Sequence, residues 1–164
     1  MRNVSGTGAP IPVRKYLHQS LKHWLGRMLS RSDIEEYLEL PHPNSPSPTM
    51  NDIFDGMILR RFLGPDGRRF LDAPSGELRL IFGLSTDGFN PYQMKEAKQD
   101  VSSTAIYMVC LHLPPHLRYL PENVYLAGVI PGPSKPSTEQ INHFLALIVD
   151  VLLKIVDAVV SYTA

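Results

Sequence analysis

Three apolar runs followed by one long amphipathic segment constrain the fold of this chain more than any other feature. The runs cover Leu78 to Ser85, Thr104 to Leu113 and Asn123 to Ile130, and prolines or a polar loop follow each of them. From Ser137 onward, apolar residues recur at helical spacing, and Ser137 with Gln140 forms a capping-box pattern. Three strands joined in sequence predict an antiparallel meander. With a helix packed on it, the fold class is α+β, with an α/β-like variant left open.

The carboxylate of Asp87 follows the first of these runs and has two interpretations. An acid held at the end of a strand with apolar residues behind it can be the first metal ligand in phosphoryl transfer. An Asp-Gly pair, formed here by Asp87 and Gly88, is also typical of an ordinary tight turn. The residues by themselves leave both interpretations open.

The beginning of the chain is basic and helical in pattern. We predict one helix over Pro12 to Ser30 and a second that begins at Ser32, which forms a capping-box pattern with Glu35. Every charged residue before Asp33 is basic: Arg2, Arg14, Lys15, Lys22, Arg27 and Arg31. Such a surface can bind phosphate groups, and it is equally typical of the solvated side of a helix.

A proline-rich stretch separates this basic segment from the remainder. Four prolines between Pro41 and Pro48 forbid a helix or a central strand there. We therefore divide the chain into a basic helical segment (1–40), a linker (41–50) and a core (51–164).

Two arginine pairs, Arg60-Arg61 and Arg68-Arg69, flank the turn Pro65-Asp66-Gly67 of a predicted hairpin. We predict its first strand over Met57 to Phe62. The arginines can contact a DNA backbone, or they form the polar surface of the hairpin.

Composition excludes several classes of protein. With 164 residues, 43% of them apolar and 20% charged, the chain has the size of one globular domain. Its formal net charge is zero, so no global field attracts a polyanion. A single cysteine, Cys110, excludes an intrachain disulfide and a cysteine-based zinc site within the chain, and we predict it to be buried. The apolar stretch from Phe144 to Val160 carries three charges, which disfavour a membrane span, and the N-terminus has no signal-peptide pattern.

Several tracts of the sequence carry a resemblance to a known family. In order they are YLHQSLKHWLGRMLSRSDIEEYL (Tyr16 to Leu38), NDIFDG (Asn51 to Gly56), GLSTDGFNP (Gly83 to Pro91), AIYMVCLHLPPHLRY (Ala105 to Tyr119) and AGVIPGPSKP (Ala127 to Pro136). In this order and spacing they resemble successive blocks of the CACTA-type (En/Spm-like) transposase superfamily, in the form carried by mushroom-forming fungi. The resemblance covers nearly the whole chain from about Pro12.

This resemblance implies a fold and a reaction. The fold is a set of N-terminal helices and the opening half of a ribonuclease H-like domain, made of a three-stranded antiparallel meander and a long helix. The reaction is cut-and-paste DNA transposition, in which two Mg²⁺ or Mn²⁺ ions held by an Asp, a second Asp and a Glu support strand cleavage and joining. By position, Asp87 is the first of these metal ligands.

The resemblance places the other two acids beyond the long helix, so the catalytic triad is incomplete in the chain up to Ala164. We therefore expect weak or no metal binding and no cleavage by the chain alone, and leave open whether it is an enzyme. The implied partner is transposon-end DNA in the nucleus. The candidate contacts to DNA are Arg14, Lys15, Lys22, Arg27, Arg60 and Arg61.

Two other interpretations remain. In one, the chain is a non-catalytic module that binds nucleic acid, or that binds a protein or a second copy through an open sheet edge or the long helix. In the other, it is an unrelated α+β domain in which Asp87 is a turn residue.

Overall fold

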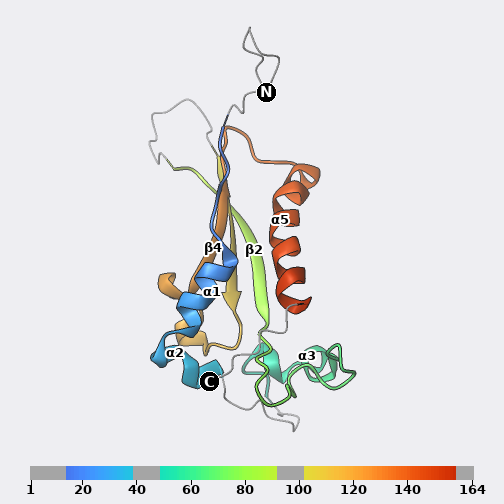
Figure 1. The fold of residues 1–164 in the computed structure, drawn as a ribbon. Coiled ribbons are helices and arrows are strands. Elements are labelled where there is room, and N and C mark those ends of the chain that lie inside the picture. Colours follow the sequence, from blue (N-terminus) through green and yellow to red (C-terminus); the bar gives the residue numbers. More distant parts are fainter. Residues whose placement is uncertain (1–13, 39–48, 92–101, 158–164) are drawn as a thin grey trace.

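A four-stranded antiparallel sheet forms the centre of the fold (Figure 1). The computed structural model describes residues 14–38, 49–91 and 102–157. Its strands are β1 (Leu17–His18), β2 (Phe82–Phe89), β3 (Ser103–Cys110) and β4 (Val124–Ile130), in the spatial order β1-β4-β3-β2. Because β2, β3 and β4 are neighbours in both sequence and space, the predicted antiparallel meander and the α+β class are confirmed.

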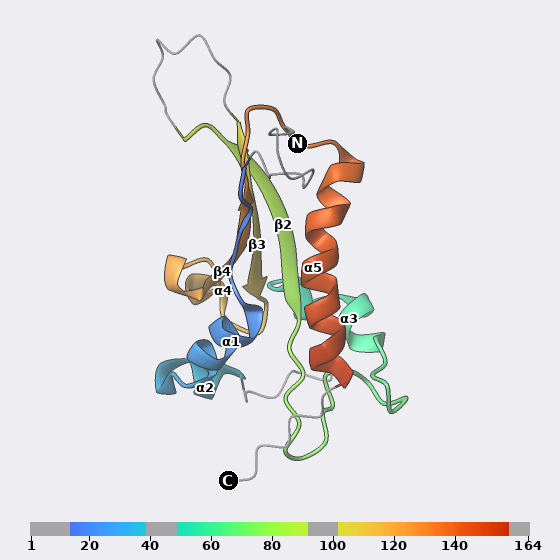
Figure 2. The same cartoon turned by 45° about the horizontal axis from the view of Figure 1, so that its top comes forward.

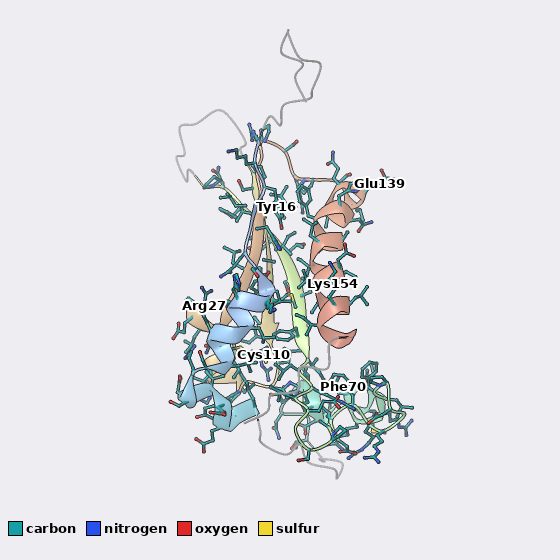
Figure 3. The ribbon with its side chains drawn as sticks, in the orientation of Figure 1. Tyr16, Arg27, Phe70, Cys110, Glu139 and Lys154 are labelled. Atoms are coloured by element: carbon teal, nitrogen blue, oxygen red, sulfur yellow. The ribbon has the colours of Figure 1, made fainter. Side chains whose placement is uncertain are left out.

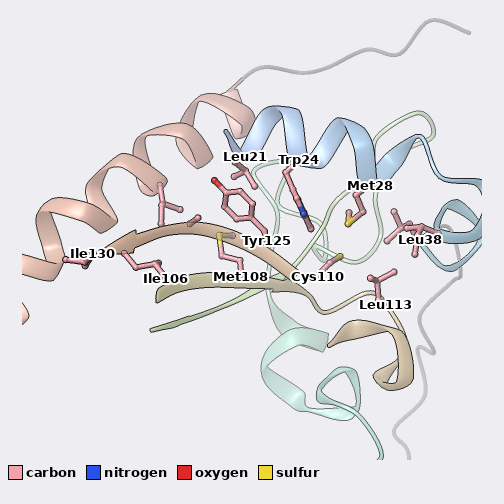
Figure 4. Close-up of a cluster of buried hydrophobic side chains, with 13 residues drawn as sticks. Leu21, Trp24, Met28, Leu38, Ile106, Met108, Cys110, Leu113, Tyr125 and Ile130 are labelled. Carbon is pink, nitrogen blue, oxygen red and sulfur yellow. The ribbon is translucent and has the colours of Figure 1, made fainter. Parts of the chain in front are cut away.

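Two helices cover one face of this sheet. They are α1 (Leu21–Leu29) and α5 (Thr138–Asp157), and both lie on the same side of the strands in Figure 4. The remaining helical elements, which Figures 1 and 2 place near the lower end of the sheet, are α2 (Ser32–Leu38), the 3-10 helix η1 (Ile53–Asp55), α3 (Met57–Arg61), α4 (Pro115–Arg118) and the 3-10 helix η2 (Pro121–Asn123). None of the described helices is long and apolar enough to cross a membrane.

The hydrophobic core lies between the sheet and these two helices. Alternate residues of β3, among them Ile106, Met108 and Cys110, are buried on this face, which we call the covered face. Trp24 of α1 packs on them, with its ring centroid 5.3 Å from that of Tyr125 on β4. The burial of Cys110 is confirmed, and it raises the pKa of the thiol. Residues from both sides of the proposed linker therefore share one core, although 39–48 lie outside the described residues.

The opposite face, which we call the open face, is much less buried. The ladder places Leu17 and Leu126 on it, and their side chains are 72% and 45% exposed. Because successive side chains of a strand point to opposite faces, odd-numbered and even-numbered residues of a regular strand lie on different faces of the sheet. Odd-numbered residues of β2 and β3 belong to the open face.

Strand β1 replaces the first part of a predicted helix. The helix predicted over Pro12 to Ser30 begins only at Leu21, after Ser20 accepts a hydrogen bond from the backbone N–H of His23 at 3.4 Å. Before it, Leu17 pairs with Val129, and the ring of Tyr16 packs at 4.8 Å from that of Phe144. Packing of Tyr16 between the sheet and α5 is a tertiary contact that helical spacing does not reveal.

Two further local predictions are corrected, and one is confirmed. The strand predicted over Met57 to Phe62 is helix α3, because the Asp52–Asp55 capping box starts a helical turn directly before it. Ser32, predicted to cap the second helix with Glu35, is instead the first residue of helix α2. The backbone N–H groups of residues 34 and 35 donate to the Arg31 carbonyl, so the helical hydrogen bonds begin one residue earlier. At the start of α5, Ser137 and Gln140 exchange the predicted capping bonds of 2.9 and 3.3 Å.

Arg118 connects the end of β3 to the segment that contains η1. Its buried guanidinium donates to the carbonyl oxygens of Leu111 at 2.7 Å and Leu113 at 3.0 Å. It also donates to Oδ2 of Asp52 at 2.7 Å. One side chain thus satisfies backbone acceptors after β3 and fixes the position of a segment distant in sequence.

We predict that Arg118→Met destabilises the protein by about 3 kcal/mol, because it leaves buried acceptors and the Asp52 carboxylate without their donor. The free energy of unfolding from urea titration measures this loss. Asp52→Asn is the matched control. It retains an acceptor and a good N-cap residue, so its loss is about 1 kcal/mol. Equal losses for the two variants would contradict this role of Arg118.

We also predict that Gly128→Ala weakens the attachment of β1. An added Cβ would overlap the Tyr16 ring and lie 2.6 Å from the Leu17 carbonyl oxygen. Such overlap costs about 1–3 kcal/mol. Gly26→Ala in α1 is the control, because an added Cβ there meets nothing within 4 Å and alanine favours the helix. Thermal unfolding should show a lower midpoint for the first variant and an unchanged or higher one for the second.

Candidate nucleic-acid interface

Asp87 lies inside strand β2. The ladder runs from Phe82↔Cys110 to Phe89↔Ser103, and Asp87 is opposite Ala105. The strand predicted over Leu78 to Ser85 is therefore shifted toward the C-terminus. Asp87 and Gly88 pair within the ladder, so the tight-turn interpretation is wrong.

The shift has a visible cause in the residues that precede β2. The buried guanidinium of Arg79 pairs with Asp66 at 2.9 Å and with Glu77 at 2.6 Å. It also lies 5.8 Å from the centre of the Phe70 ring. These contacts hold the start of the apolar run in the preceding loop. The polar residues after the run pair with apolar β3 instead, an example of tertiary context overriding strand propensity.

The carboxylate of Asp87 belongs to the open face and is exposed. Asp87, Ala105, Val129 and Leu17 form one row across the four strands. At the usual spacing between strands, Asp87 is about 14 Å from Leu17 along this row. It therefore lies near the outer edge of the sheet, at the end where residues 14 and 15 lead into β1.

A single carboxylate does not form a magnesium site. Mg²⁺ requires near-octahedral oxygen coordination and is held by carboxylates together with water or substrate phosphates. Among residues 14–38, 49–91 and 102–157, no three His, Cys, Asp or Glu side chains gather where they could hold a metal ion. The described residues therefore do not form a complete metal site by themselves.

Four exposed cations lie along the side of the molecule formed by β1 and α1. We call this surface the basic edge, and its members are Arg14, Lys15, Lys22 and Arg27. The first two directly precede β1, and the other two lie on the outward side of α1, where Figure 3 shows Arg27. No acidic residue occurs in the chain before Asp33 to offset them. The structure thus brings four of the six predicted contacts onto one side of the protein.

A groove of about 700 Å³ adjoins the basic edge. Its walls come from α1 and from residues 121–124, and its lining includes Trp24, Arg27 and Glu122. With the Gln19 amide in the orientation that satisfies its hydrogen bonds, its oxygen accepts from Arg27 at 2.8 Å and its nitrogen donates to the Leu126 carbonyl at 3.0 Å. Sequence reasoning missed this groove because its two walls are far apart in the chain.

Arg31 marks the end of the basic edge. Its guanidinium pairs with Asp33 at 2.7 Å and donates to Oδ1 of Asn123 at 2.7 Å. The hydrogen bond from Arg31 lowers the pKa of Asp33. The charge of Arg31 is thus neutralised within the protein, whereas the four cations before it remain exposed.

The other two predicted contacts are separate from the basic edge. Arg60 is only 8% exposed, with its Nη2 3.6 Å from Oδ1 of Asp55 and its Nε donating to the Phe54 carbonyl at 3.3 Å. Arg61 is exposed at the end of α3, which lies away from α1 in both Figures 1 and 2. Of this pair, Arg61 alone presents its side chain to solvent.

A family model described as Transposase family tnp2 matches residues 68–164. The chain belongs to the tnp2 family of transposases. The match includes the whole meander with Asp87 and helix α5, and it leaves the basic edge outside. The transposase part of the sequence resemblance is thereby confirmed. No curated protein and no solved structure matches the chain.

Proposed function

We propose that this chain is a transposase-derived fragment that binds DNA through its basic edge and carries, in Asp87, the first metal-ligand position of the family reaction. The observation that supports this most strongly is the match to the tnp2 transposase family over the segment that contains Asp87. Membership in a transposase family implies DNA binding in general. The basic edge is the part of the described surface whose charge fits that partner.

Within this family we propose the CACTA-type (En/Spm-like) form of mushroom-forming fungi, on the order and spacing of the sequence blocks. We also propose that the core is the opening half of a ribonuclease H-like domain. The support is an acid on the first of three consecutive antiparallel strands, followed by a long helix. Its substrate would be transposon-end DNA, which places its site of action in the nucleus.

The basic edge suits a phosphate backbone because its four charges are exposed and the segment that carries them has no acid before Asp33. Glu122 lines the adjoining groove together with Arg27. Lys22 and Arg27 lie on the outward side of one short helix, while Arg14 and Lys15 continue the surface along the chain toward the end of the sheet. Contacts of this kind supply affinity that is independent of sequence and sensitive to salt. The basic edge therefore accounts for binding and not for a choice of DNA sequence.

We predict that Lys22→Ala/Arg27→Ala weakens binding to duplex DNA and lowers the slope of log K against log salt concentration by about 2. The control is Lys135→Ala/Lys154→Ala, which removes the same charge from exposed positions elsewhere; Figure 3 shows Lys154 on α5, apart from Arg27. Fluorescence anisotropy over a range of salt concentrations measures both quantities. An equal effect of the two double variants would reject the basic edge as the binding surface.

We propose further that the chain alone does not cut or join DNA, because Asp87 is one carboxylate of a larger set. With Mg²⁺ or Mn²⁺, we expect supercoiled plasmid to remain intact in a nicking assay. The control substitution is Asp150→Asn, which removes another exposed carboxylate. Nicking that is lost in Asp87→Asn and retained in Asp150→Asn would overturn this prediction.

A binding module without chemistry is the alternative, and it predicts the same DNA affinity. The two differ at Asp87. If the residue keeps its metal-ligand role, Mn²⁺ should broaden the backbone NMR signals of Asp87 and Gly88 in the unmodified chain and not in Asp87→Asn. A purely structural Asp87 predicts no such difference.

A further inference from the structure

The groove beside the basic edge has walls that are fixed to one another. One wall is helix α1, and the other is η2 with the start of β4. Arg31, which follows α1, donates to Oδ1 of Asn123 at 2.7 Å. Asn123 is fully buried, and its side-chain nitrogen donates to the Leu117 carbonyl at 2.9 Å. These bonds tie the two walls together, so the groove exists in the folded chain before any ligand arrives.

Apolar side chains supply part of the lining. They are Trp24 and Met28 of α1, which Figure 4 shows on the side of the helix that faces the sheet, and Val124 of β4. The Trp24 ring centroid lies 5.3 Å from that of Tyr125 and 6.4 Å from that of Phe82, and these neighbours hold the indole in place. With about 700 Å³, the groove has the size of a small-molecule site and can accommodate a flat ring system.

The polar residues of the groove offer both donors and an acceptor. Nη2 of Arg27 donates to the Gln19 side chain at 2.8 Å, and a guanidinium has further N–H groups for another partner. The Glu122 side chain is exposed, and none of the ion pairs among the described residues involves it. An ionised carboxylate only accepts hydrogen bonds. A complementary ligand therefore presents acceptors to Arg27 and donors to Glu122.

The balance of charge in the groove excludes a simple ion as its ligand. Arg31 also lines the groove, but its charge is neutralised by Asp33 at 2.7 Å. This leaves one guanidinium, Arg27, and one carboxylate, Glu122. A phosphate inside the groove would be repelled by Glu122, and a cation would be repelled by Arg27. The groove therefore suits a neutral, flat group that carries donors and acceptors together.

We propose that this groove binds an unpaired guanine base of the DNA that lies on the basic edge. The inference rests on the proposed function, because Arg27 belongs to both the basic edge and the groove. Guanine presents O6 and N7 as acceptors, the pair that a guanidinium binds in a bidentate manner. Its N1–H and its amino group at C2 are neighbouring donors, which suit the Glu122 carboxylate. The flat face of the ring can contact the apolar lining.

Guanine is favoured over the other bases by the number of its donors. Adenine and cytosine each present one amino group, and thymine presents a single N–H between two carbonyl oxygens. In a duplex, the N1–H and amino donors of guanine are bonded to cytosine. The groove is therefore expected to select a guanine at a single-stranded end or one displaced from the duplex, and the phosphates beside that guanine would remain on the basic edge.

Fluorescence of the full chain tests this inference, because Trp24 is the only tryptophan and lines the groove. The probes are a blunt DNA duplex and the same duplex with a single-stranded TGT or TTT extension, placed at either the 3′ or the 5′ end. At one of the two ends, we expect the TGT extension to bind about 10-fold more tightly than TTT, as one bidentate contact to a base supplies. We expect it also to change the Trp24 emission. Equal affinities for TGT and TTT at both ends would refute the proposal.

A charge variant assigns the preference to the groove. Glu122→Gln should lose the preference for TGT while its affinity for the blunt duplex stays equal or rises, because a negative charge near the basic edge is removed. The matched control is Glu139→Gln, which removes an exposed carboxylate at the start of α5, apart from Arg27 in Figure 3, and should keep the preference. Far-UV circular dichroism shows that each variant is folded. A folded Glu122→Gln that retains the full preference would exclude the groove.

A change in the DNA provides a second test that does not alter the protein. Inosine lacks the amino group of guanine, so replacing the guanine of TGT by inosine should weaken binding to the unmodified chain. The same replacement should have no effect on Glu122→Gln, because the partner of the amino group is then lost. An equal effect of inosine on both proteins would contradict the proposed pairing.

Failure of this inference differs from failure of the proposed function. Binding of the blunt duplex without a preference for TGT would reject the groove as a base site and leave the basic edge as the DNA surface. Absence of binding to every duplex would reject both. Lys22→Ala separates the two contributions, because it should weaken binding of the TGT and TTT duplexes by the same factor.

Discussion

The pairing of β2 with β3 is the interaction on which the surface features of this protein depend. β3 is anchored because Ile106, Met108 and Cys110 are buried against α1 and α5. The pairing of β2 with β3 then decides which residues of β2 lie on which face of the sheet, because β2 lacks comparable burial of its own. A slip of one residue would turn Asp87 to the covered face and exchange the inward and outward backbone groups of the strand. The position of the carboxylate and the chemistry of the outer edge are therefore two consequences of one register.

Burial divides the arginines of this chain into internal connectors and surface cations. Arg118 and Arg79 are 5% and 8% exposed, and each bonds to acidic partners within the protein. The hydrogen bonds that Arg79 donates to Glu77 and Asp66 raise its pKa further, and the bond from Arg79 lowers the pKa of Asp66. Arg27 is exposed, and it donates to the uncharged amide of Gln19. Because a guanidinium offers five donors, its function depends on which acceptors the fold brings near it. Counting arginines in a sequence therefore overestimates the cationic surface available to DNA.

The sequence predicted those elements whose limits are set locally. β3, β4 and α5 agree with their predicted segments to within a few residues, because apolar runs end at prolines or begin at a capping box. Prediction failed where distant contacts decide. Arg79 holds the start of the run before β2 in a loop through Asp66, and Tyr16 extends the chain as β1 by packing on Phe144. The basic residues were identifiable from charge alone, whereas the groove beside them depends on α1 approaching η2 and could not be.

The two lateral edges of the sheet differ in the kind of partner that they suit. The β1 side carries side-chain cations, which attract a polyanion over a distance but provide no directional pairing. The β2 side carries backbone donors and acceptors, which have short range and specify an extended peptide. On the open face, the row from Leu17 to Asp87 spans about 14 Å, close to the width of a DNA major groove of about 12 Å. Nucleic acid that binds the basic edge, as we propose, would have this row of open-face residues between it and Asp87. The cations and the free backbone groups thus lie at opposite edges of one small sheet, and Asp87 lies on the strand that carries the backbone groups.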